Sequence, residues 1–337
     1  SIKTNEERMI VSKTPLRISF MGGMSDLPSY YEKEAGAVVT TAIDKYIYIT
    51  INKKFDDKIR ASYSITEFVD NPNELKHELI RESLNTVAIH KGIEITSISD
   101  IPSKGTGLGS SSTYTVGLLN ALYAYLGKSS SAEKLARHAC DIEINKCKRD
   151  IGKQDQYIAA YGGLNYIRFN SDGSTFVNPI ICPKETKKEL QENLLFFYTG
   201  LSRTESAHEI LTETSSFLKS NKKKRLLVKQ LVTLADEMKL SLEESNLEYF
   251  GYLLNEGWVI KRKTQNSISN EYIDEWYRIA ISNGALGGKL SGAGGGGFLI
   301  FYAPKEKHNQ IINSLPKLTH IPINLEPQGT QIIYVGG

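Results

Sequence analysis

A glycine-rich stretch followed by serines, at residues 101–117, constrains this chain more than any other feature. Glycines stand at alternate positions, Gly105, Gly107 and Gly109, and three serines and an apolar helical pattern follow directly. Glycine lets the backbone approach a ligand closely and adopt conformations that a β-carbon forbids. The free N–H groups and positive dipole end of a helix that begins near Ser110 would add further donors. The stretch therefore predicts a phosphate-binding loop, and a nucleotide triphosphate is the ligand that fits it.

Two well-known glycine loops do not match this stretch. A Walker A loop ends in glycine, lysine and serine or threonine, but no lysine follows Gly109, and the nearby Lys104 precedes the glycines. The dinucleotide fingerprint has the spacing G-x-G-x-x-G directly after a strand, whereas the spacing here is G-x-G-x-G after Ile-Pro-Ser. A flexible loop capped by serines remains the alternative interpretation.

The length and composition are typical of a globular protein with about two domains. The chain has 337 residues, of which 40% are hydrophobic and 23% charged. No apolar run is long enough to span a membrane, and the N-terminus lacks the pattern of a secretory signal. The three cysteines form no C-x-x-C pair, and their odd number argues against a disulfide framework. We therefore expect a cytoplasmic protein with no membrane partner.

The charge balance argues against nucleic acid as the main partner. Lysine and arginine number 41 against 38 aspartates and glutamates, which leaves a net charge of only +3. The one basic run, at residues 222–225, opens a long amphipathic pattern, so we interpret it as a solvated helix face.

Apolar periodicity predicts both strands and helices. Strands are expected at residues 9–20 with an interruption at Pro15, and at 38–41, 46–51, 93–98, 164–169, 175–181, 194–199, 298–302 and 332–335. Helices are expected at residues 74–90, 110–126, after a capping box of Ser130 and Glu133, and at 227–242, 249–263, 272–283 and 305–315. No internal repeat or linker marks a domain boundary, which we place between residues 172 and 190.

Three motifs together resemble those of the GHMP kinase superfamily. They are PLR and GGMSD within residues 15–26, the glycine-serine loop, and KLSGAGGGG at residues 289–297, in the order and spacing of that superfamily. The resemblance covers essentially the whole chain and implies an α+β, two-domain fold. It implies a ribosomal S5 domain 2-like, ATP-binding N-terminal domain at residues 1–184 and a ferredoxin-like C-terminal domain at residues 185–337, with the active site between them.

Four further phrases are similar to the sugar 1-kinases of the heptose 7-phosphate and fucose type. These are GKQDQY, AAYGGLN, YTGLSR and EGW, which begin at residues 152, 159, 198 and 256. One departure from the pattern is Ser291, where we expect leucine. The resemblance implies ATP- and Mg²⁺-dependent phosphorylation of the anomeric hydroxyl of a sugar phosphate of the heptose 7-phosphate type, for nucleotide-activated heptose and surface polysaccharide synthesis.

The same resemblance implies roles for individual residues. Asp155 would accept the proton of the attacking hydroxyl, and Arg17 would stabilise the transferring phosphoryl group. Ser111 and Glu143 would hold Mg²⁺, a hard cation that prefers oxygen ligands. Each residue has a plainer alternative: a turn former for Asp155, a strand-end ion pair for Arg17, and a surface helix carboxylate for Glu143.

Two sets of binding residues follow from the resemblance. The predicted nucleotide-binding residues are Lys104, Gly105, Thr106, Gly107, Leu108, Gly109, Ser110, Ser111 and Ser112. The predicted substrate-binding residues are Gly22, Gly23, Ser25, Asp26, Gly163, Arg203, Arg262, Lys289, Gly294 and Gly295. Asp26 would accept sugar hydroxyls, with an N-cap for a helix near Pro28 as its alternative. Three of the set, Arg203, Arg262 and Lys289, are candidates for a remote phosphate, with surface charges as their alternative.

The leading hypothesis is therefore a sugar-phosphate kinase that binds ATP, Mg²⁺ and a small sugar phosphate. A free-sugar 1-kinase of the L-fucose or galactose type remains an alternative. A non-catalytic sugar-binding regulator on the same fold is disfavoured by Asp155, because a binder needs no base. A nucleic-acid-binding S5-like module is disfavoured by the charge balance. The sequence leaves open whether the protein is a monomer or a homodimer.

Overall fold

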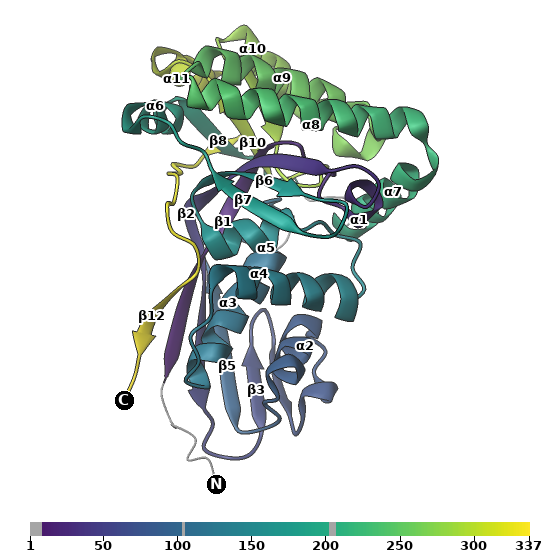
Figure 1. Ribbon diagram of the computed structural model, residues 1–337. Helices are drawn as coiled ribbons and strands as arrows, with labels where there is room; N and C mark the ends of the chain where they lie inside the picture. Colours follow the sequence, from purple (N-terminus) through teal and green to yellow (C-terminus); the bar gives the residue numbers. More distant parts are fainter. Residues whose placement is uncertain (1–8, 103–104, 202–206) are drawn as a thin grey trace.

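The computed structural model describes residues 9–102, 105–201 and 207–337. They form one sheet of eight strands and one of four, each with helices packed against it (Figure 1). The strands of the large sheet are β1 (Ile10–Met21), β2 (Gly36–Lys53), β3 (Ile59–Ser62), β4 (Thr66–Val69), β5 (Ile93–Ser99), β6 (Leu164–Phe169), β7 (Thr175–Pro179) and β12 (Gln331–Val335). The strands of the small sheet are β8 (Leu194–Tyr198), β9 (Gly287–Leu290), β10 (Phe298–Tyr302) and β11 (Thr319–His320). The predicted α+β class is confirmed.

The described ranges also contain eleven α-helices. They are α1 (Pro28–Tyr31), α2 (Glu78–Val87), α3 (Ser110–Tyr125), α4 (Ala132–Cys140), α5 (Gln154–Tyr161), α6 (Lys184–Asn193), α7 (Ala207–Ser220), α8 (Lys222–Glu243), α9 (Leu247–Arg262), α10 (Glu271–Ser282) and α11 (His308–Ser314). Short 3₁₀ turns lie at Pro72–Glu74, Asn266–Ile268 and Lys305–Lys307, and a π-helical turn at Asp141–Lys146 directly extends α4. Sequence periodicity did not predict β3, β4, β9, β11, α5, α6 or α7.

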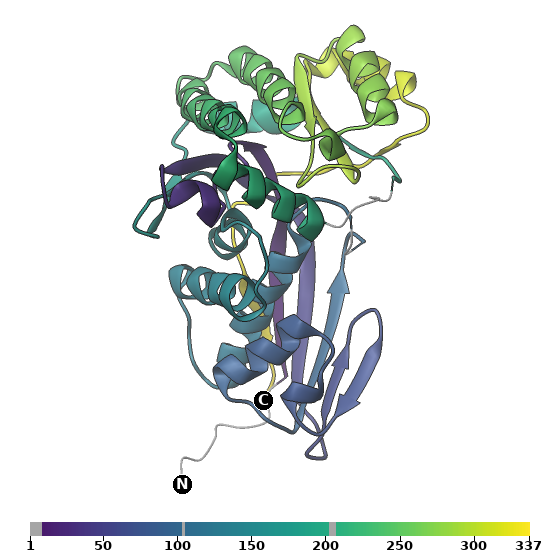
Figure 2. The ribbon, with the colours of Figure 1, turned by 90° about the vertical axis from the view of Figure 1, so that its right-hand side faces the viewer.

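The large sheet carries the helix that follows the glycine loop. Its order is β12-β1-β2-β5-β3-β4, and β6 pairs with β2 and with β7. In β2, Ile47, Ile49 and Ile51 are buried, which is the period-two pattern of a half-covered strand. Figure 2 shows α2, α3, α4 and α5 together against one face of this sheet. The loop before α3 therefore lies beside β1, in the region of Arg17.

Strand β1 continues through Pro15, so the predicted interruption there was wrong. The register against β2 nevertheless shifts between Pro15 and Arg17. Such a bulge turns a side chain out of the regular alternation and is common beside active sites. The Arg17 N–H donates to the carbonyl of Leu108, at 3.0 Å, which ties β1 to the glycine loop.

The small sheet has the ferredoxin-like arrangement that the resemblance implied. Its four strands are antiparallel in the order β11-β8-β10-β9, which is 4-1-3-2 in chain order. Helices lie between β8 and β9 and between β10 and β11, as in a βαββαβ unit. Its core includes Trp258, Leu290 and Phe301, all almost fully buried. Helices α8 to α11 lie together at this end of the molecule (Figure 1).

The last strand returns to the first sheet. In β12, Val335 pairs with Ile10 of β1, so the last strand lies beside the first. Figure 1 shows this final yellow segment descending along the large sheet. The domain boundary at residue 184 stays a prediction. Because β12 belongs to the large sheet, the chain returns from the C-terminal half to the N-terminal half after β11.

One local expectation about helix ends changed and another agrees with the structure. The N-cap of α4 is Ser131, whose Oγ accepts from the Lys134 N–H at 3.1 Å, so the capping box predicted at Ser130 was one residue early. Gly127, at φ +70°, follows the end of α3, as predicted. Within the described ranges, no helix is both long and apolar enough to cross a bilayer.

Candidate active site

A cavity of about 230 Å³ lies where the two sheets meet. The glycine loop forms one wall, and β1 and α5 form another. The remainder is formed by α7, α9, β9 and residues 291–297, which we call the second glycine run. Its lining residues are Arg17, Ser19, Gly23, Met24, Asp26, Leu27, 105–112, Glu143, Ile151, Gly152, Gln154, Asp155, Ala207, Leu211, Thr214, Lys261, Gln265, Lys289, Gly292 and Ala293. Side chains from distant parts of the chain thus face one space.

The glycine loop is held by close backbone contacts. Gly109 is the N-cap of α3 at φ +77°, and a β-carbon there would lie 3.1 Å from Arg17 Cγ and 3.3 Å from Asp155. A β-carbon on Gly107 would lie 2.3 Å from the carbonyl oxygen of Ser291, which comes from the second glycine run. Both positions therefore require glycine. The start of α3 faces the cavity with its unpaired N–H groups, and Ser110 Oγ is buried without a partner among the described residues.

Arg17 and Asp155 form a close ion pair beside this helix start. Arg17 Nε lies 2.5 Å from Asp155 Oδ1, and Arg17 Nη1 donates to the carbonyl of Gly107 at 2.7 Å. The arginine is buried, whereas the aspartate side chain is 25% exposed, toward the cavity. Asp155 lies in the first turn of α5 rather than in a free turn. The two residues predicted as catalytic are thus in contact with each other and with the loop.

Ser111 and Glu143, the predicted metal ligands, also meet. Ser111 Oγ donates to Glu143 Oε2 at 2.8 Å, and Gln156 Nε2 donates to Oε1 at 3.1 Å. Glu143 is fully buried, so it is not a surface helix carboxylate. Burial raises its pKa, and the hydrogen bonds and Arg149 oppose that rise. It lies in the π-helical turn after α4, a distortion that is frequent at functional sites.

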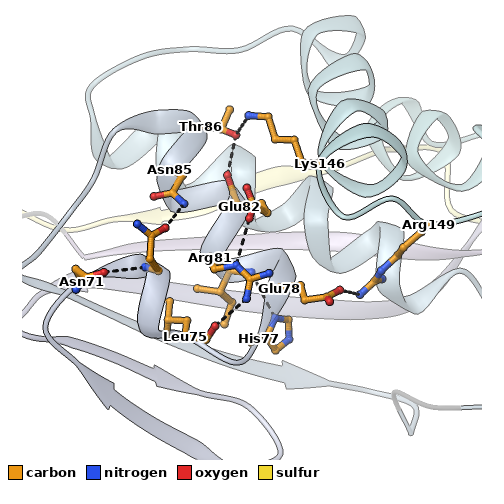
Figure 3. A network of polar contacts seen from close by, with 12 residues as sticks. Asn71, Leu75, His77, Glu78, Arg81, Glu82, Asn85, Thr86, Lys146 and Arg149 are labelled. Carbon is orange, nitrogen blue, oxygen red and sulfur yellow. Dashed lines mark hydrogen bonds and ion pairs between the residues drawn. The ribbon is translucent and has the colours of Figure 1, made fainter.

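Sequence reasoning missed Arg149. Its Nη1 donates to Ser111 Oγ at 2.8 Å and lies 3.8 Å from Glu143 Oε2, while Nη2 lies 3.4 Å from Glu78 of α2. Figure 3 shows Arg149 reaching toward Glu78 at the start of α2, and Lys146 reaching toward Thr86 near the end of α2. These contacts tie α2 to the π-helical turn that carries Glu143.

Two oxygen donors fit a magnesium ion that also binds phosphates. Ser111 Oγ and the buried Glu143 carboxylate are hard ligands that face the cavity beside the helix start. Among the described residues, no group of three or more His, Cys, Asp or Glu could hold a metal by itself. Magnesium usually binds through one or two protein oxygens, with phosphates and water completing the shell, so this donor set is adequate.

Asp26 faces the same cavity, close to α5. Its Oδ2 accepts from the N–H of Gln154 at 3.1 Å, and a β-carbon on Gly152 would lie 1.8 Å from that oxygen. The N-cap of α1 is Leu27, without a side-chain cap bond, so the capping alternative for Asp26 was wrong. Burial, and then the charge of Asp155, raise the pKa of Asp26 from 3.8 to about 6.

Lys289 reaches the cavity from the small sheet. Its Nζ donates to the carbonyl of Ser19 at 2.6 Å, and the side chain is buried. Burial, Lys261 and Arg17 together hold its pKa well below the ordinary value. The surface-charge alternative for Lys289 was therefore wrong.

The other predicted substrate residues lie in different places. Gly23 lines the cavity, but Gly22 and Ser25 build the turn behind it, where Ser25 Oγ donates to the Gly22 carbonyl at 2.7 Å. Gly163 donates to the Glu326 carbonyl at 2.9 Å, and thus contacts the returning chain rather than the cavity. Lys104 and Arg203 lie outside the described residues.

Two corrections concern the C-terminal half. Arg262 faces away from the cavity: its Nη2 lies 2.9 Å from Asp274, and its side chain is 40% exposed. Gly294 and Gly295 pack on Ile268, whose carbonyl accepts from the Gly295 N–H at 2.9 Å. The cavity-facing part of this glycine run is Gly292 and Ala293.

The lysine that does face the cavity from α9 is Lys261, which the sequence reading missed. The buried positions of α9 include Leu254, Gly257, Trp258 and Lys261, at helical spacing. Position 261 therefore belongs to the buried stripe, and position 262 does not. The phase of the helix was the signal that could have identified Lys261.

The raised pKa of Asp26 gives a testable pH dependence of stability. A carboxyl whose pKa is higher in the native state favours folding at low pH, and this contribution is lost as the pH rises from about 4 through about 6. We expect the unfolding free energy of the wild type to fall by roughly 2–3 kcal/mol relative to Asp26→Asn between pH 4 and pH 7. Urea unfolding of both proteins at several pH values would measure it. A difference that does not change with pH would contradict the assignment.

The comparisons with known proteins agree with this geometry. Residues 74–163 match the model of the GHMP kinases N-terminal domain, and residues 238–320 match that of the GHMP kinases C-terminal domain. The chain is 30% identical to D-glycero-alpha-D-manno-heptose 7-phosphate kinase of Campylobacter jejuni, over 92% of this chain and 94% of the relative. It is 26% identical to galactokinase of Pyrococcus furiosus, over 90% and 91%.

A solved structure supports the fold. A D-glycero-D-manno-heptose 1-phosphate kinase from Bacteroides thetaiotaomicron superposes with a TM-score of 0.79, at 24% identity, over 97% of this chain and 100% of the other. The family models cover both halves, and the heptose 7-phosphate kinase matches nearly end to end. The chain belongs to the GHMP kinase family and is a phosphotransferase of that family.

Proposed function

We propose that this protein transfers the γ-phosphoryl group of ATP to the anomeric hydroxyl of a sugar phosphate, of the heptose 7-phosphate type. The observation that carries the proposal is the Arg17–Asp155 pair beside the start of α3, in a cavity that also holds Asp26 and Lys289. The glycine loop and the start of α3 offer donors for phosphates. Asp26 offers an acceptor, and Lys289 a cation, for an anionic sugar. The heptose 7-phosphate kinase relative agrees with this substrate class.

In the proposed reaction the loop and helix start bind the triphosphate. The backbone N–H groups of 105–112 donate to phosphate oxygens, and Ser110 Oγ is a further donor without another partner among the described residues. Ser111 and Glu143 would hold Mg²⁺, which when bound neutralises charge on the phosphate oxygens. Arg149 contacts both residues and so orients them.

The transfer itself requires a positioned acceptor and a proton sink. Asp26 accepts a sugar hydroxyl and so orients the ring, while Asp155 accepts the proton of the attacking anomeric hydroxyl. The hydroxyl oxygen bonds to the γ-phosphorus as the bond to the β-phosphate oxygen breaks, which leaves ADP. Arg17 donates toward the transferring group and also fixes Asp155 through the 2.5 Å contact. We place this reaction in the cytoplasm, where ATP is available.

A panel of substrates tests the proposal. ADP release is coupled to a spectrophotometric assay and measured for D-glycero-D-manno-heptose 7-phosphate, the same heptose without phosphate, L-fucose, D-galactose and D-mannose. We expect the highest kcat/KM for the 7-phosphate, and phosphorus NMR should show the new phosphate on the anomeric carbon. A higher kcat/KM for a free sugar would make this a free-sugar 1-kinase. ATP-independent sugar binding without turnover would indicate a regulator.

A further inference from the structure

Two buried lysines face the cavity from the C-terminal half, away from the glycine loop. Lys261, from the last turn of α9, is 9% exposed, and Lys289, from β9, is 6% exposed. Lys261 Nζ donates to the Gly292 carbonyl at 2.5 Å, and Lys289 Nζ donates to the Ser19 carbonyl at 2.6 Å. These backbone contacts hold both ammonium groups in the cavity wall.

The positive charge around Lys289 favours the binding of an anion. The charged groups that most affect it are Lys261 and Arg17, both positive. Of the carboxylates that line the cavity, Asp155 is paired with Arg17, Glu143 with Ser111 and Gln156, and Asp26 with the Gln154 N–H. Within the described ranges, no carboxylate lies within ion-pair distance of Lys289. A buried ammonium group without a carboxylate partner is costly unless a negative charge from a ligand offsets it.

Unpartnered acceptors line the same cavity. Gln265 Nε2 donates to Thr214 Oγ1 and to the Ile210 carbonyl, which fixes the amide, while Gln265 Oε1 is buried without a hydrogen-bond partner among the described residues. Gln154 Oε1 and Ser19 Oγ are in the same situation. All three residues line the cavity. An amide oxygen that lacks a donor fits a hydroxyl of the ligand, because a hydroxyl can donate where a phosphate dianion cannot.

We propose that Lys261 and Lys289 bind a phosphate monoester on the substrate, remote from the reacting hydroxyl, and that Gln265 accepts a hydrogen bond from a neighbouring hydroxyl. This inference rests on the proposed function and names the residues that select a sugar phosphate over a free sugar. Lys261 takes the place that the sequence reading gave to Arg262. The pair also explains why a lysine occupies the buried stripe of α9, where an apolar residue would pack at lower cost.

A phosphate in this position could belong to the sugar or could be the γ-phosphate of ATP. The sugar is the better source, because the proposed triphosphate site already has the glycine loop, the start of α3 and Arg17 to bind its phosphates. The two sources differ in a measurable way. A lysine that binds the γ-phosphate affects the affinity for a non-hydrolysable ATP analogue but not that for ADP, whereas a lysine that binds the sugar phosphate affects neither.

The test replaces Lys261 by methionine, which keeps the length of the side chain and removes the charge. Lys263→Met, two positions along and exposed, is the matched control. For each protein, kcat/KM is measured for heptose 7-phosphate and for the unphosphorylated heptose, and Kd is measured for ADP and for the ATP analogue. We expect Lys261→Met to lower kcat/KM for the 7-phosphate about 10²-fold and to change that for the free heptose only a few-fold. Both nucleotide affinities should stay at the wild-type value.

Lys289→Met is the second variant, in case Lys261→Met does not fold, and it should lose the same preference. Equal losses for both sugars, or a loss of affinity for the ATP analogue alone, would overturn the subsite. If the wild type uses the 7-phosphate well and both lysine variants keep the preference, the subsite is wrong and the proposed function stands. A wild type that does not use the sugar phosphate overturns the proposed function, and the subsite with it.

Discussion

Replacing Asp155 by asparagine should lower kcat about 10²–10⁴-fold and leave the affinity for ATP close to that of the wild type. Asparagine has nearly the same shape, and its Oδ1 can still accept from Arg17 Nε, which lies 2.5 Å away. The glycine loop and the start of α3 are untouched by the change. The variant therefore removes the proposed proton acceptor while the proposed triphosphate site keeps its geometry.

The measurement is steady-state ADP release at saturating sugar phosphate, together with calorimetric titration of a non-hydrolysable ATP analogue. Asp150→Asn is the matched control, because Asp150 is an exposed carboxylate five positions earlier that bonds Thr212 at 3.1 Å. It should behave like the wild type. Turnover near the wild-type value in Asp155→Asn would remove Asp155 from the proton-transfer step, and an equal loss in Asp150→Asn would point to a structural cause.

The local parts of the site were predictable because they depend on short stretches. Alternate glycines before a serine-rich helix start indicate an anion site without any knowledge of the fold. Gly109 and Gly107 are glycines for reasons that only the structure supplies: the first leaves room for Arg17 and Asp155, and the second for the Ser291 carbonyl. The motif gave the position of the site, and the packing gave the reason for it.

Parts that depend on long-range contacts were not predictable. Arg149 meets Glu78 across 71 positions of the chain, and nothing near either residue indicates the other. The pairing of β12 with β1 joins the last strand of the chain to the first. A short strand of exposed residues has no periodicity strong enough to specify its partner.

The sequence could have predicted that Lys261 of α9, rather than Arg262, faces the cavity, but this was missed. Charge alone does not separate Lys261 from Arg262, because both are basic and adjacent. The apolar stripe of the helix does separate them, since it reaches position 261 at a spacing of three from Trp258. A basic residue on a buried stripe that lines a cavity is a stronger indication of a ligand than a basic residue near a motif, because long basic side chains are otherwise mostly exposed.

Gly152→Ala should lower kcat/KM for the sugar substrate about 10²-fold without loss of nucleotide binding. A β-carbon at this position would lie 1.8 Å from Asp26 Oδ2 and 2.3 Å from its Cγ, so the carboxylate must move away from the N–H of Gln154. The backbone of Gly152 does not have a positive φ, so alanine adds no conformational strain of its own. The substitution thus displaces one side chain and leaves the fold intact.

A double-mutant cycle separates this displacement from a general disturbance. Asp26→Ala, Gly152→Ala and the double variant are compared by kcat/KM for the sugar phosphate and by Kd for ADP. The three atoms nearest the new methyl group all belong to the Asp26 carboxylate, so once Asp26 is truncated Gly152→Ala should add little to the loss caused by Asp26→Ala. Additive losses would show that Gly152 acts through something other than Asp26. A Gly152→Ala enzyme with the wild-type kcat/KM would show that the position of the Asp26 carboxylate does not control use of the sugar.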